Sequence, residues 1–429
     1  MISLVPFTTL LSAIADNRGK TCPTSENGVP LIATNCVKNS NLYPTYEKVR
    51  FVSEETYDSW FRAHPQPGDL IFVTKGSPGE VCFTPDPVDF CIAQDMVAIR
   101  ADEAVVHPKY LFAALRAKKT QQDILNLHVG TMIPHFKKGD FGKLLIPLPD
   151  LQTQKSIGEA YYNISLKIAN NRRMNETLEE MARAIFKSWF VDFDPVHAKS
   201  AGNAPAHMDA DTAALFPSSF GDDGLPEGWS LGHLSDLVDL NPTERIKKGE
   251  LSSYIEMANL PTSGSNISNV VLREFKSGTK FRNGDTLLAR ITPCLENGKT
   301  AYVDVLDEGE VAWGSTEYIV MRTKDPLPKF YSYVVARSEH FREHAIRSMT
   351  GTSGRQRAQA DMVAAYEVVI PPKSVASAFG DIGQNWFSKI RCNAAESKTL
   401  AELRDTLLPK LMSGEIRVSD AEREVEAVV

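Results

Sequence analysis

The sequence has no apolar run of eighteen residues, and its six cysteines form no Cys-x-x-Cys pair. The first absence argues against a membrane span, and the second argues against a structural zinc site or a disulfide framework. We therefore expect a cytoplasmic chain with free thiols and no membrane partner. The apolar start MISLVPFTTLLSAIADNRG has no basic leader and no small-residue cleavage site. Leu10, Leu11 and Ile14 predict one face of a short helix there instead.

Words for several common chemistries are also missing. There is no Asn-Pro-Pro-aromatic or Asp-Pro-Pro-Tyr word for base methylation and no G-x-S-x-G elbow. No glycine-rich cofactor loop follows a predicted strand. We therefore expect no catalysis by this chain and no cofactor in it.

Two motifs that could carry chemistry are better explained as ordinary surface. The stretch His340-Phe341-Arg342-Glu343-His344 fits H-x-x-E-H, but the equivalent helix of the internal repeat described below has no such pair and no third ligand stands out. Residues 296–300 end like a phosphate-binding loop, but Pro293 stands where its first glycine should be. We expect no metal site and no nucleotide site.

The 429 residues carry a net charge of −7, and the length predicts more than one domain. The net charge argues weakly against a nucleic-acid partner, but the cations are unevenly placed. Residues 109–143 and 329–357 are both rich in Lys and Arg, whereas acidic residues gather at 192–250 and at the C-terminus. Two basic segments on an acidic chain could be two DNA-facing surfaces or two solvated helix faces.

An internal repeat organises the chain. KIANNRRMNETLEEMARAIFKSW (167–189) and KIRCNAAESKTLAELRDTLLPKL (389–411) share Lys-Ile, Asn and Thr-Leu, always 222 positions apart. Shorter words recur in the same order. Gly68-Asp69 and Gly284-Asp285 each precede an apolar run and then a basic residue, Lys75 or Arg290. Such self-similarity predicts two copies of one design, each a globular module followed by a long helix.

Each module mixes strand and helix signals. The runs DLIFV, TLLA, MVAIR and EYIVMR predict buried strands, and residues 108–125 and 328–346 have the length and spacing of helices. The stretch 196–224 has the Ala, Pro, Ser, Gly and Asp content of a linker. We therefore predict an α+β fold with modules at 1–149 and 225–371, long helices at 150–195 and 372–418, a linker at 196–224 and an acidic tail at 419–429.

The long helices have apolar residues at intervals of seven, the pattern of a coiled-coil seam. Antiparallel packing is the simplest arrangement for two helices of one chain, although each helix could instead cover only its own module. Roughly 40 residues at about 1.5 Å each would make a spacer of about 60 Å. Asn171 and Asn393 fall inside the seam, where a buried polar residue fixes the register at a cost in stability. The expected seam residues are Ile164, Ile168, Leu178, Ile185, Trp189, Trp386, Ile390, Leu400, Leu407 and Leu411.

With these words in hand, the chain resembles the specificity subunit of bacterial type I restriction–modification systems along nearly its whole length. NNRRMNETLEEMARAIFKSWFVDFDPV and LAELRDTLLPKLMSGEIRV are similar to the central and C-terminal conserved regions of that family. PGDLIFVTKGSPGE, NGDTLLARITPCLENGK and GTMIPHFKKGDFGKLLIPLP are similar to segments of its target-recognition domains. The second closing segment, GTSGRQRAQADMVAAYEVVIPP, is longer and lacks the PHF word, so the two modules should read different sequences.

The resemblance implies two target-recognition domains that each read one half of a bipartite site in double-stranded DNA. It also implies helices that hold two modification (methyltransferase) subunits, with restriction (endonuclease and translocase) subunits joining the complex. S-adenosylmethionine and ATP would then be bound by the partner subunits and not by this chain.

Sequence readout needs side chains that reach base edges from loops on a rigid scaffold, while Lys and Arg can also hold phosphates. Among the candidates, Arg290, Arg355 and Gln356 are the preferred base contacts, and Lys137, Lys138 and Lys299 the preferred phosphate contacts. For each residue, an ordinary surface side chain is the alternative. The expected DNA-binding residues are Lys75, Ser77, Thr131, His135, Lys137, Lys138, Arg290, Thr292, Asn297, Lys299, Thr352, Ser353, Arg355, Gln356 and Arg357.

Two other classes of function remain open at this point. A coiled-coil adaptor with two protein-binding heads would suit the net acidity, but the basic segments at equivalent places of the repeat count against it. An enzyme built around the H-x-x-E-H helix would need bound zinc, which a metal assay would detect.

Overall fold

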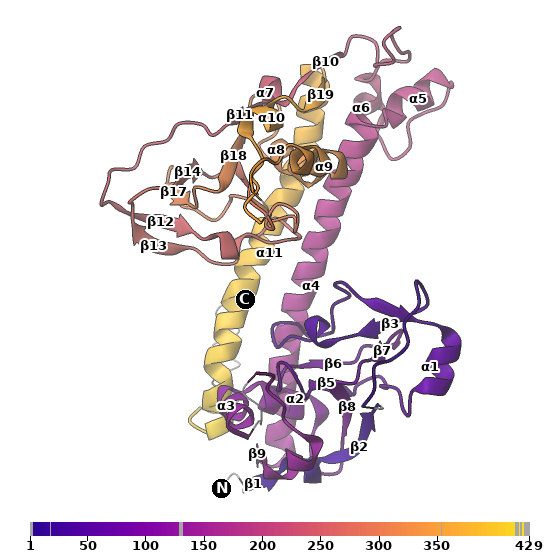
Figure 1. The fold of residues 1–429 in the computed structure, drawn as a ribbon, viewed down its shortest axis with the longest axis vertical. Coiled ribbons are helices and arrows are strands. Elements are labelled where there is room, and N and C mark those ends of the chain that lie inside the picture. Colours follow the sequence, from indigo (N-terminus) through magenta and orange to yellow (C-terminus); the bar gives the residue numbers. More distant parts are fainter. Residues whose placement is uncertain are drawn as a thin grey trace. The chain divides into compact units, whose positions relative to one another are not determined.

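The computed structural model describes residues 3–17, 19–127, 132–352, 354–416, 420 and 423. The chain divides into two compact units. The first comprises Met1–Asn171 and Glu396–Val429, and the second comprises Arg172–Ala395. Each unit is an α+β module with parts of the two long helices, α4 (Leu151–Phe190) and α11 (Lys373–Ser413) (Figure 1). Among the described residues, no helix is both long and apolar enough to cross a membrane.

The module of the first unit is built from nine strands, three helices and three short 3-10 turns within its described residues. Its sheets have the orders β1-β9, β2-β8-β5-β6 and β4-β3-β7. The elements are β1 (Ser3–Pro6), η1 (Phe7–Leu10), β2 (Leu11–Asp16), β3 (Val29–Ile32), η2 (Thr34–Cys36), β4 (Arg50–Val52), α1 (Glu54–Trp60), β5 (Leu70–Val73), β6 (Val81–Phe83), β7 (Cys91–Ile92), β8 (Met96–Ala101), α2 (Pro108–Arg116), α3 (Lys118–Leu127), η3 (Lys138–Lys143) and β9 (Leu145–Leu148).

The module of the second unit repeats this topology. Its sheets have the orders β10-β19, β11-β18-β15-β16 and β13-β12-β17-β14, so the four-stranded sheet that contains the central strand is wired identically in both modules. The elements are α5 (Asp194–Ser200), α6 (Ala210–Ala214), β10 (Ser230–His233), α7 (Leu234–Leu237), β11 (Val238–Leu240), β12 (Leu251–Ile255), η4 (Met257–Asn259), β13 (Val271–Glu274), β14 (Thr279–Arg282), β15 (Asp285–Ala289), β16 (Thr300–Tyr302), β17 (Val311–Gly314), β18 (Tyr318–Thr323), α8 (Tyr331–Arg337), α9 (Glu339–Arg347), α10 (Ala360–Ala364) and β19 (Glu367–Ile370).

Inside each unit the two long helices pack antiparallel. In the first unit, the beginning of α4 lies against the end of α11, where Ile164, Ile168 and Leu400 form one buried cluster. In the second unit, the end of α4 and the beginning of α11 pack together, and the asparagines Asn175 and Asn393 are hydrogen-bonded at 2.8 Å. The expected antiparallel packing is therefore present in both units.

The remaining seam residues pack on helix and module at once. Leu407 and Leu411 belong to the core of the first module, while Trp189 and Ile390 are buried in the core of the second. Leu178, Ile185 and Trp386 are half-buried against that second core. Helix–helix packing and covering of a module are thus not alternatives here, because one core serves both.

Glycines in the long helices let the modules approach closely. A Cβ on Gly158 of α4 would lie 2.5 Å from the backbone nitrogen of Tyr110 on α2. A Cβ on Gly383 of α11 would lie 2.1 Å from the ring of Phe330, which stacks on Phe387 with centroids 4.5 Å apart. Only a residue without a side chain fits at these two contacts.

Three sequence predictions need correction. Leu11 and Ile14 lie on strand β2, paired with β8, and not on a helix face. The predicted helices 108–125 and 328–346 are each two helices, because Ala117 and Ser338 adopt extended backbone angles. The segment 196–224 is not a bare linker. It contains α5 and α6, and Val196 and Phe216 are buried in the second core.

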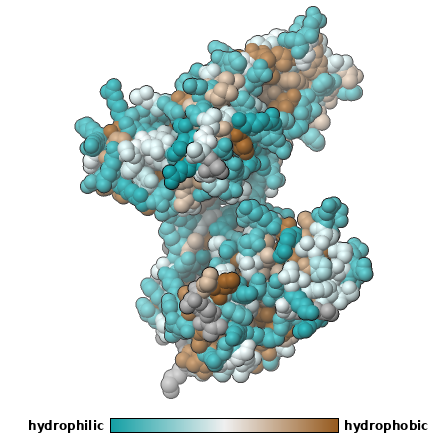
Figure 2. All heavy atoms as spheres, in the orientation of Figure 1, coloured by the Kyte–Doolittle hydropathy of each residue, from teal (hydrophilic) through white to brown (hydrophobic). Residues whose placement is uncertain are grey.

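The surface carries no extended apolar face in the view shown. Figure 2 shows mainly hydrophilic side chains, with hydrophobic ones in small separate patches. The expected acidic tail 419–429 lies outside the described residues except for positions 420 and 423.

Candidate nucleic-acid interface

A fully buried central strand leads into the candidate loop of each module. All four residues of β5 and all five of β15 are buried, so the loops that follow stand on rigid supports. An ion pair fixes each strand at its start. Asp69 binds Arg100 with two hydrogen bonds of 2.8 and 3.0 Å, and Asp285 binds Arg322 with two of 2.6 and 2.7 Å. Both carboxylates are almost completely buried, at 2 and 1% exposure.

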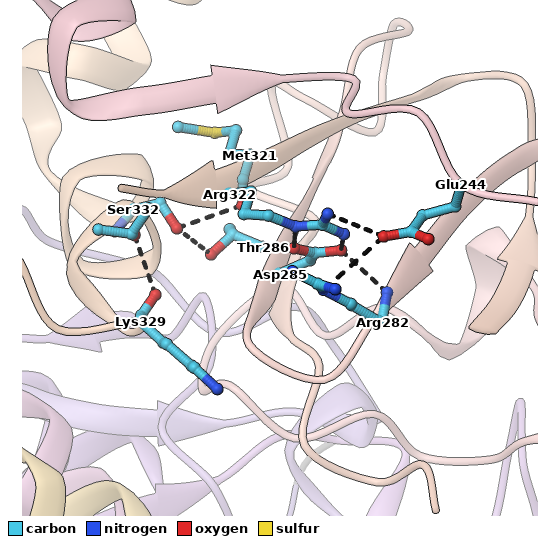
Figure 3. A network of polar contacts seen from close by, with 9 residues as sticks. Glu244, Arg282, Asp285, Thr286, Met321, Arg322, Lys329 and Ser332 are labelled. Carbon is cyan, nitrogen blue, oxygen red and sulfur yellow. Dashed lines mark hydrogen bonds and ion pairs between the residues drawn. The ribbon is translucent and has the colours of Figure 1, made fainter. Parts of the chain in front are cut away.

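The second module extends this ion pair into a network (Figure 3). Glu244 lies 2.8 Å from Arg322 and 3.7 Å from Arg282, and the Arg282 backbone N–H donates to Asp285 at 2.9 Å. On the neighbouring residue, the hydroxyl of Thr286 shares a 2.8 Å hydrogen bond with Ser332. Buried charges that are fully paired in this way hold the strand in one position.

The loop after the central strand is joined to the closing segment of the same module. In the first module Lys75 and His135 form an antiparallel bridge. The Gly76 N–H donates to the Pro134 carbonyl at 2.9 Å, and the Phe136 N–H donates to the Thr74 carbonyl at 2.8 Å. Two groups of candidate residues that lie about sixty positions apart in the sequence thus become one surface.

The second module has the same joint. Ile291 and Arg357 form the bridge, the Thr292 N–H donates to the Gln356 carbonyl at 3.0 Å, and the Ala358 N–H donates to the Arg290 carbonyl at 2.8 Å. We call these two joints the loop bridges: residues 74–76 with 134–136, and residues 290–292 with 356–358.

The loop bridges correct one detail of the repeat. By hydrogen-bond pattern Arg290 is equivalent to Thr74, and Lys75 is equivalent to Ile291. Lys75 and Arg290 therefore do not occupy the same position, although both follow a Gly-Asp turn and an apolar run. His135 is equivalent to Arg357, so the side chains at the two bridges differ in type.

An acidic residue lies under each loop bridge, and the sequence analysis missed both. The Asp95 carbonyl accepts hydrogen bonds from the backbone N–H groups of Thr74 and Lys75 at 2.9 and 3.2 Å. The Glu317 carbonyl accepts one from the Arg290 N–H at 3.0 Å. The signal was available, because an acidic residue stands directly before each of the strands β8 and β18, 222 positions apart.

The two carboxylates pair with different cations. Asp95 lies 3.9 Å from the Lys75 ammonium. Glu317 accepts from Arg357 Nε at 2.9 Å and from Nη2 at 2.6 Å. The hydrogen bonds and charge of Arg357, with a smaller contribution from Arg290, hold the pKa of Glu317 below its usual range, although partial burial opposes this. Glu317 in turn raises the pKa of Arg357.

The other candidates of the first module are spread around the bridge. Lys137 is exposed, whereas Lys138 is ion-paired with Asp16. Ser77 is half-buried in the turn after Lys75. Thr131 lies outside the described residues.

In the second module the candidates fall into engaged and exposed groups. Lys299 donates to the Met257 carbonyl at 2.7 Å, so its charge is held against the module. Arg355, Thr352 and Asn297 are exposed on turns. Arg290 is half-buried, and its Nε has no hydrogen-bond partner in the described part of the chain. Ser353 lies outside the described residues.

The two motifs set aside earlier have structural explanations. His344 faces the Met362 carbonyl at 2.8 Å, and Glu343 pairs with Arg347. Among the described residues, no group of three His, Cys, Asp or Glu side chains could hold a metal ion. Residues 293–299 form a tight turn in which the Asn297 N–H donates to the Pro293 carbonyl at 2.9 Å.

Two similar α+β modules, each with a loop bridge and joined by two long helices, define the class of protein to which the chain is compared. Residues 17–180 match the sequence model of the type I restriction modification DNA specificity domain. Those residues belong to that domain family, and the chain resembles type I restriction enzyme specificity subunits over about four fifths of its length.

Two relatives illustrate the similarity. The MjaIX specificity subunit of Methanocaldococcus jannaschii is 22% identical over 82% of this chain and 78% of its own length. The HindI specificity subunit of Haemophilus influenzae is 24% identical over 81% of this chain and 86% of its own length. The crystal structure of a type I restriction–modification S subunit from M. genitalium shares the fold, with a TM-score of 0.53 at 15% identity and 96% coverage of both chains.

Proposed function

We propose that this protein recognises double-stranded DNA as the specificity subunit of a type I restriction–modification complex. Each module reads one half of a bipartite site through its loop bridge. The long helices α4 and α11 set the spacer between the half-sites and dock two modification subunits. Restriction subunits join the larger complex.

The recurrence of the loop bridge carries this proposal. In each module, Lys, Arg, His or Gln side chains stand on a joint that a fully buried strand supports. Such side chains can bind phosphates and the edges of bases, and a rigid scaffold holds them in one geometry. The two bridges carry different side chains, so the two half-sites should differ in sequence.

The chemistry is assigned to the partners. We propose that this chain catalyses neither methyl transfer nor cleavage, and that S-adenosylmethionine and ATP are bound by the modification and restriction subunits. We place the complex in the cytoplasm, on the ground that all six cysteines are free thiols.

The test is a long-read methylome of a host that expresses this chain with its modification subunits, beside a host that expresses those subunits alone. We expect a new methylated motif made of two short, different words across a fixed gap. A folded complex that adds no methylation would contradict the proposal and favour an adaptor with two protein-binding heads.

A further inference from the structure

The carboxylates under the loop bridges are not needed to hold the modules together. The buried pairs Asp69–Arg100 and Asp285–Arg322 fix the strands, whereas the Asp95 and Glu317 side chains are 38 and 22% exposed. Partly exposed ion pairs contribute little to stability. A negative charge at this place would also repel DNA phosphates, so its presence calls for another physical role.

The geometry of the second bridge indicates that role. Glu317 engages Nε and Nη2 of Arg357, and the remaining Nη1 donates to the Arg355 carbonyl at 3.3 Å. The Arg357 backbone also exchanges two hydrogen bonds with Thr350, at 2.9 and 3.1 Å. Arg357 is thus fully occupied within the protein, and it ties the turn that carries the exposed Arg355 to the end of the central strand.

We infer that Glu317 determines the specificity of the second module: it holds Arg357 as a brace for the turn that presents Arg355, and its charge suppresses binding to phosphates irrespective of sequence. Arg357, a candidate for base contact from its sequence position, is then a positioning residue. Asp95 has the equivalent place in the first module, where it faces Lys75. This inference rests on the proposed function.

The test compares Glu317→Gln with the wild-type chain, each in complex with its modification subunits. Binding is measured by fluorescence anisotropy across a salt series. The probes are a duplex carrying the motif from the methylome and a duplex in which only the second half-site is replaced. The neutral amide keeps the size of the side chain but cannot hold the guanidinium on both sides.

We expect the replaced duplex to bind Glu317→Gln more tightly than it binds wild type, with a salt slope steeper by about 0.9 because one more cation is available to phosphates. Discrimination between the two duplexes should fall about tenfold or more. Discrimination at the first half-site should not change. Asp95→Asn should produce the mirror result, with loss at the first half-site only.

Asp239→Asn is the matched control, because it removes one surface charge at the far end of the same strand. Asp239 is paired with Arg322 on β18, whereas Glu317 directly precedes that strand. The control should leave discrimination unchanged.

A second comparison separates bracing from direct base contact. If Glu317 acts through Arg357, Arg357→Ala should lose discrimination, and Glu317→Gln should add nothing in the Arg357→Ala background. If the two losses add, Glu317 contacts DNA by itself and the bracing role is wrong. Should Glu317→Gln fail to fold, Arg357→Lys, which keeps the charge but cannot form the two-sided contact, tests the same prediction.

Unchanged discrimination and an unchanged salt slope in Glu317→Gln would overturn the inference and leave the proposed function intact. A wild-type complex that does not distinguish the two duplexes would instead overturn the proposed function, and the inference with it.

Discussion

The cations near the loop bridges differ in what neutralises them. Lys138 is paired with Asp16 and Arg357 with Glu317, while Lys137 and Arg355 are exposed. DNA affinity depends on cations that can displace counterions from phosphates, so paired and exposed cations should contribute differently.

Lys137→Ala should weaken DNA binding by the complex and reduce its salt slope by about 0.9, because one phosphate contact is lost. Asp16→Asn should have the opposite sign, since it frees Lys138 to reach a phosphate. Both slopes are read from binding isotherms over a salt series. A Lys137→Ala slope equal to that of wild type would remove Lys137 from the interface.

Asp304, on the second module, should make stability depend on pH. Burial raises the pKa of its carboxyl to about 6, and the charge of Arg391 only partly opposes this. The folded state therefore holds a proton that the unfolded state releases between about pH 4 and 6, so stability falls as the pH rises through that window. Above it the loss is constant.

Asp304→Asn should accordingly raise the free energy of unfolding at pH 7.5, by on the order of 2 kcal/mol. At pH 4 variant and wild type should be alike, which provides the internal control. Chemical denaturation at the two pH values measures the difference. An equal gain at both would show that ionisation of Asp304 is not the cause.

The long helices meet through buried polar residues in both units. Asn171 donates to Glu396 at 2.7 Å and to Ser397 at 3.3 Å in the first unit. In the second, Asn393 donates to Asn175, which donates to the Ile390 carbonyl at 3.2 Å. Asn171 and Asn393 are 3 and 1% exposed. Their role in fixing the register stays a prediction, but their partners sharpen its test.

Asn393→Leu should lower the free energy of unfolding by about 1–3 kcal/mol, because it removes the donor to the buried Asn175. The double variant Asn175→Leu/Asn393→Leu should recover most of that loss, since leucine pairs suit the seam. The spacer of the methylated motif should become less uniform in the double variant. A sharp, unaltered spacer would refute the register role.

The glycine contacts of α11 give a second test of packing. Gly383→Ala would place a methyl group inside the ring of the buried Phe330 and should destabilise the fold by about 1–3 kcal/mol or more. Gly380→Ala is the matched control, because its Cβ would lie 3.4 Å from Pro328 and alanine favours the helix. Thermal unfolding of the two variants should move in opposite directions, and equal shifts would contradict the contact described here.

For the whole molecule, the repeat predicts that the modules act independently on DNA. Their central sheets have one topology, yet the bridge positions hold Thr74, Lys75 and His135 in the first module and Arg290, Ile291 and Arg357 in the second. The same scaffold should therefore support two different recognition sequences.

Arg355→Ala should relax or weaken recognition of the second half-site only, and Lys75→Ala that of the first only. Loss of one bidentate base contact would reduce discrimination by about 1–3 kcal/mol, and loss of a phosphate contact would leave sequence preference unchanged. The methylated motif in cells that express each variant provides the measurement. Simultaneous loss of both half-sites from either change would contradict two separate modules.

Much of the fold could be predicted from local patterns. The four predicted strands correspond to β5, β8, β15 and β18, because apolar runs bounded by turns have few alternatives to a buried strand. Both long helices lie within about five residues of their predicted bounds. The breaks at Ala117 and Ser338 were not predictable, because neither residue signals the end of a helix by its type.

The candidate interface was predictable only in part. Sequence words indicated both halves of each loop bridge, but hydrogen bonds between distant segments decided which residues lie side by side. Lys299 and Arg357 illustrate the limit. Their sequence positions suggest contact with DNA, while their side chains are bound to Met257 and Glu317.

The sequence by itself determined the repeat, the α+β class, the buried central strands and the long helices, because hydrophobic spacing and turn chemistry are local properties of the chain. Only the tertiary structure decided that one core serves helix and module together, that Arg290 corresponds to Thr74, and that Asp95 and Glu317 lie beneath the loop bridges. The physical reason is the same in each case: the partner of a side chain depends on which distant backbone groups and charges folding brings within hydrogen-bonding distance.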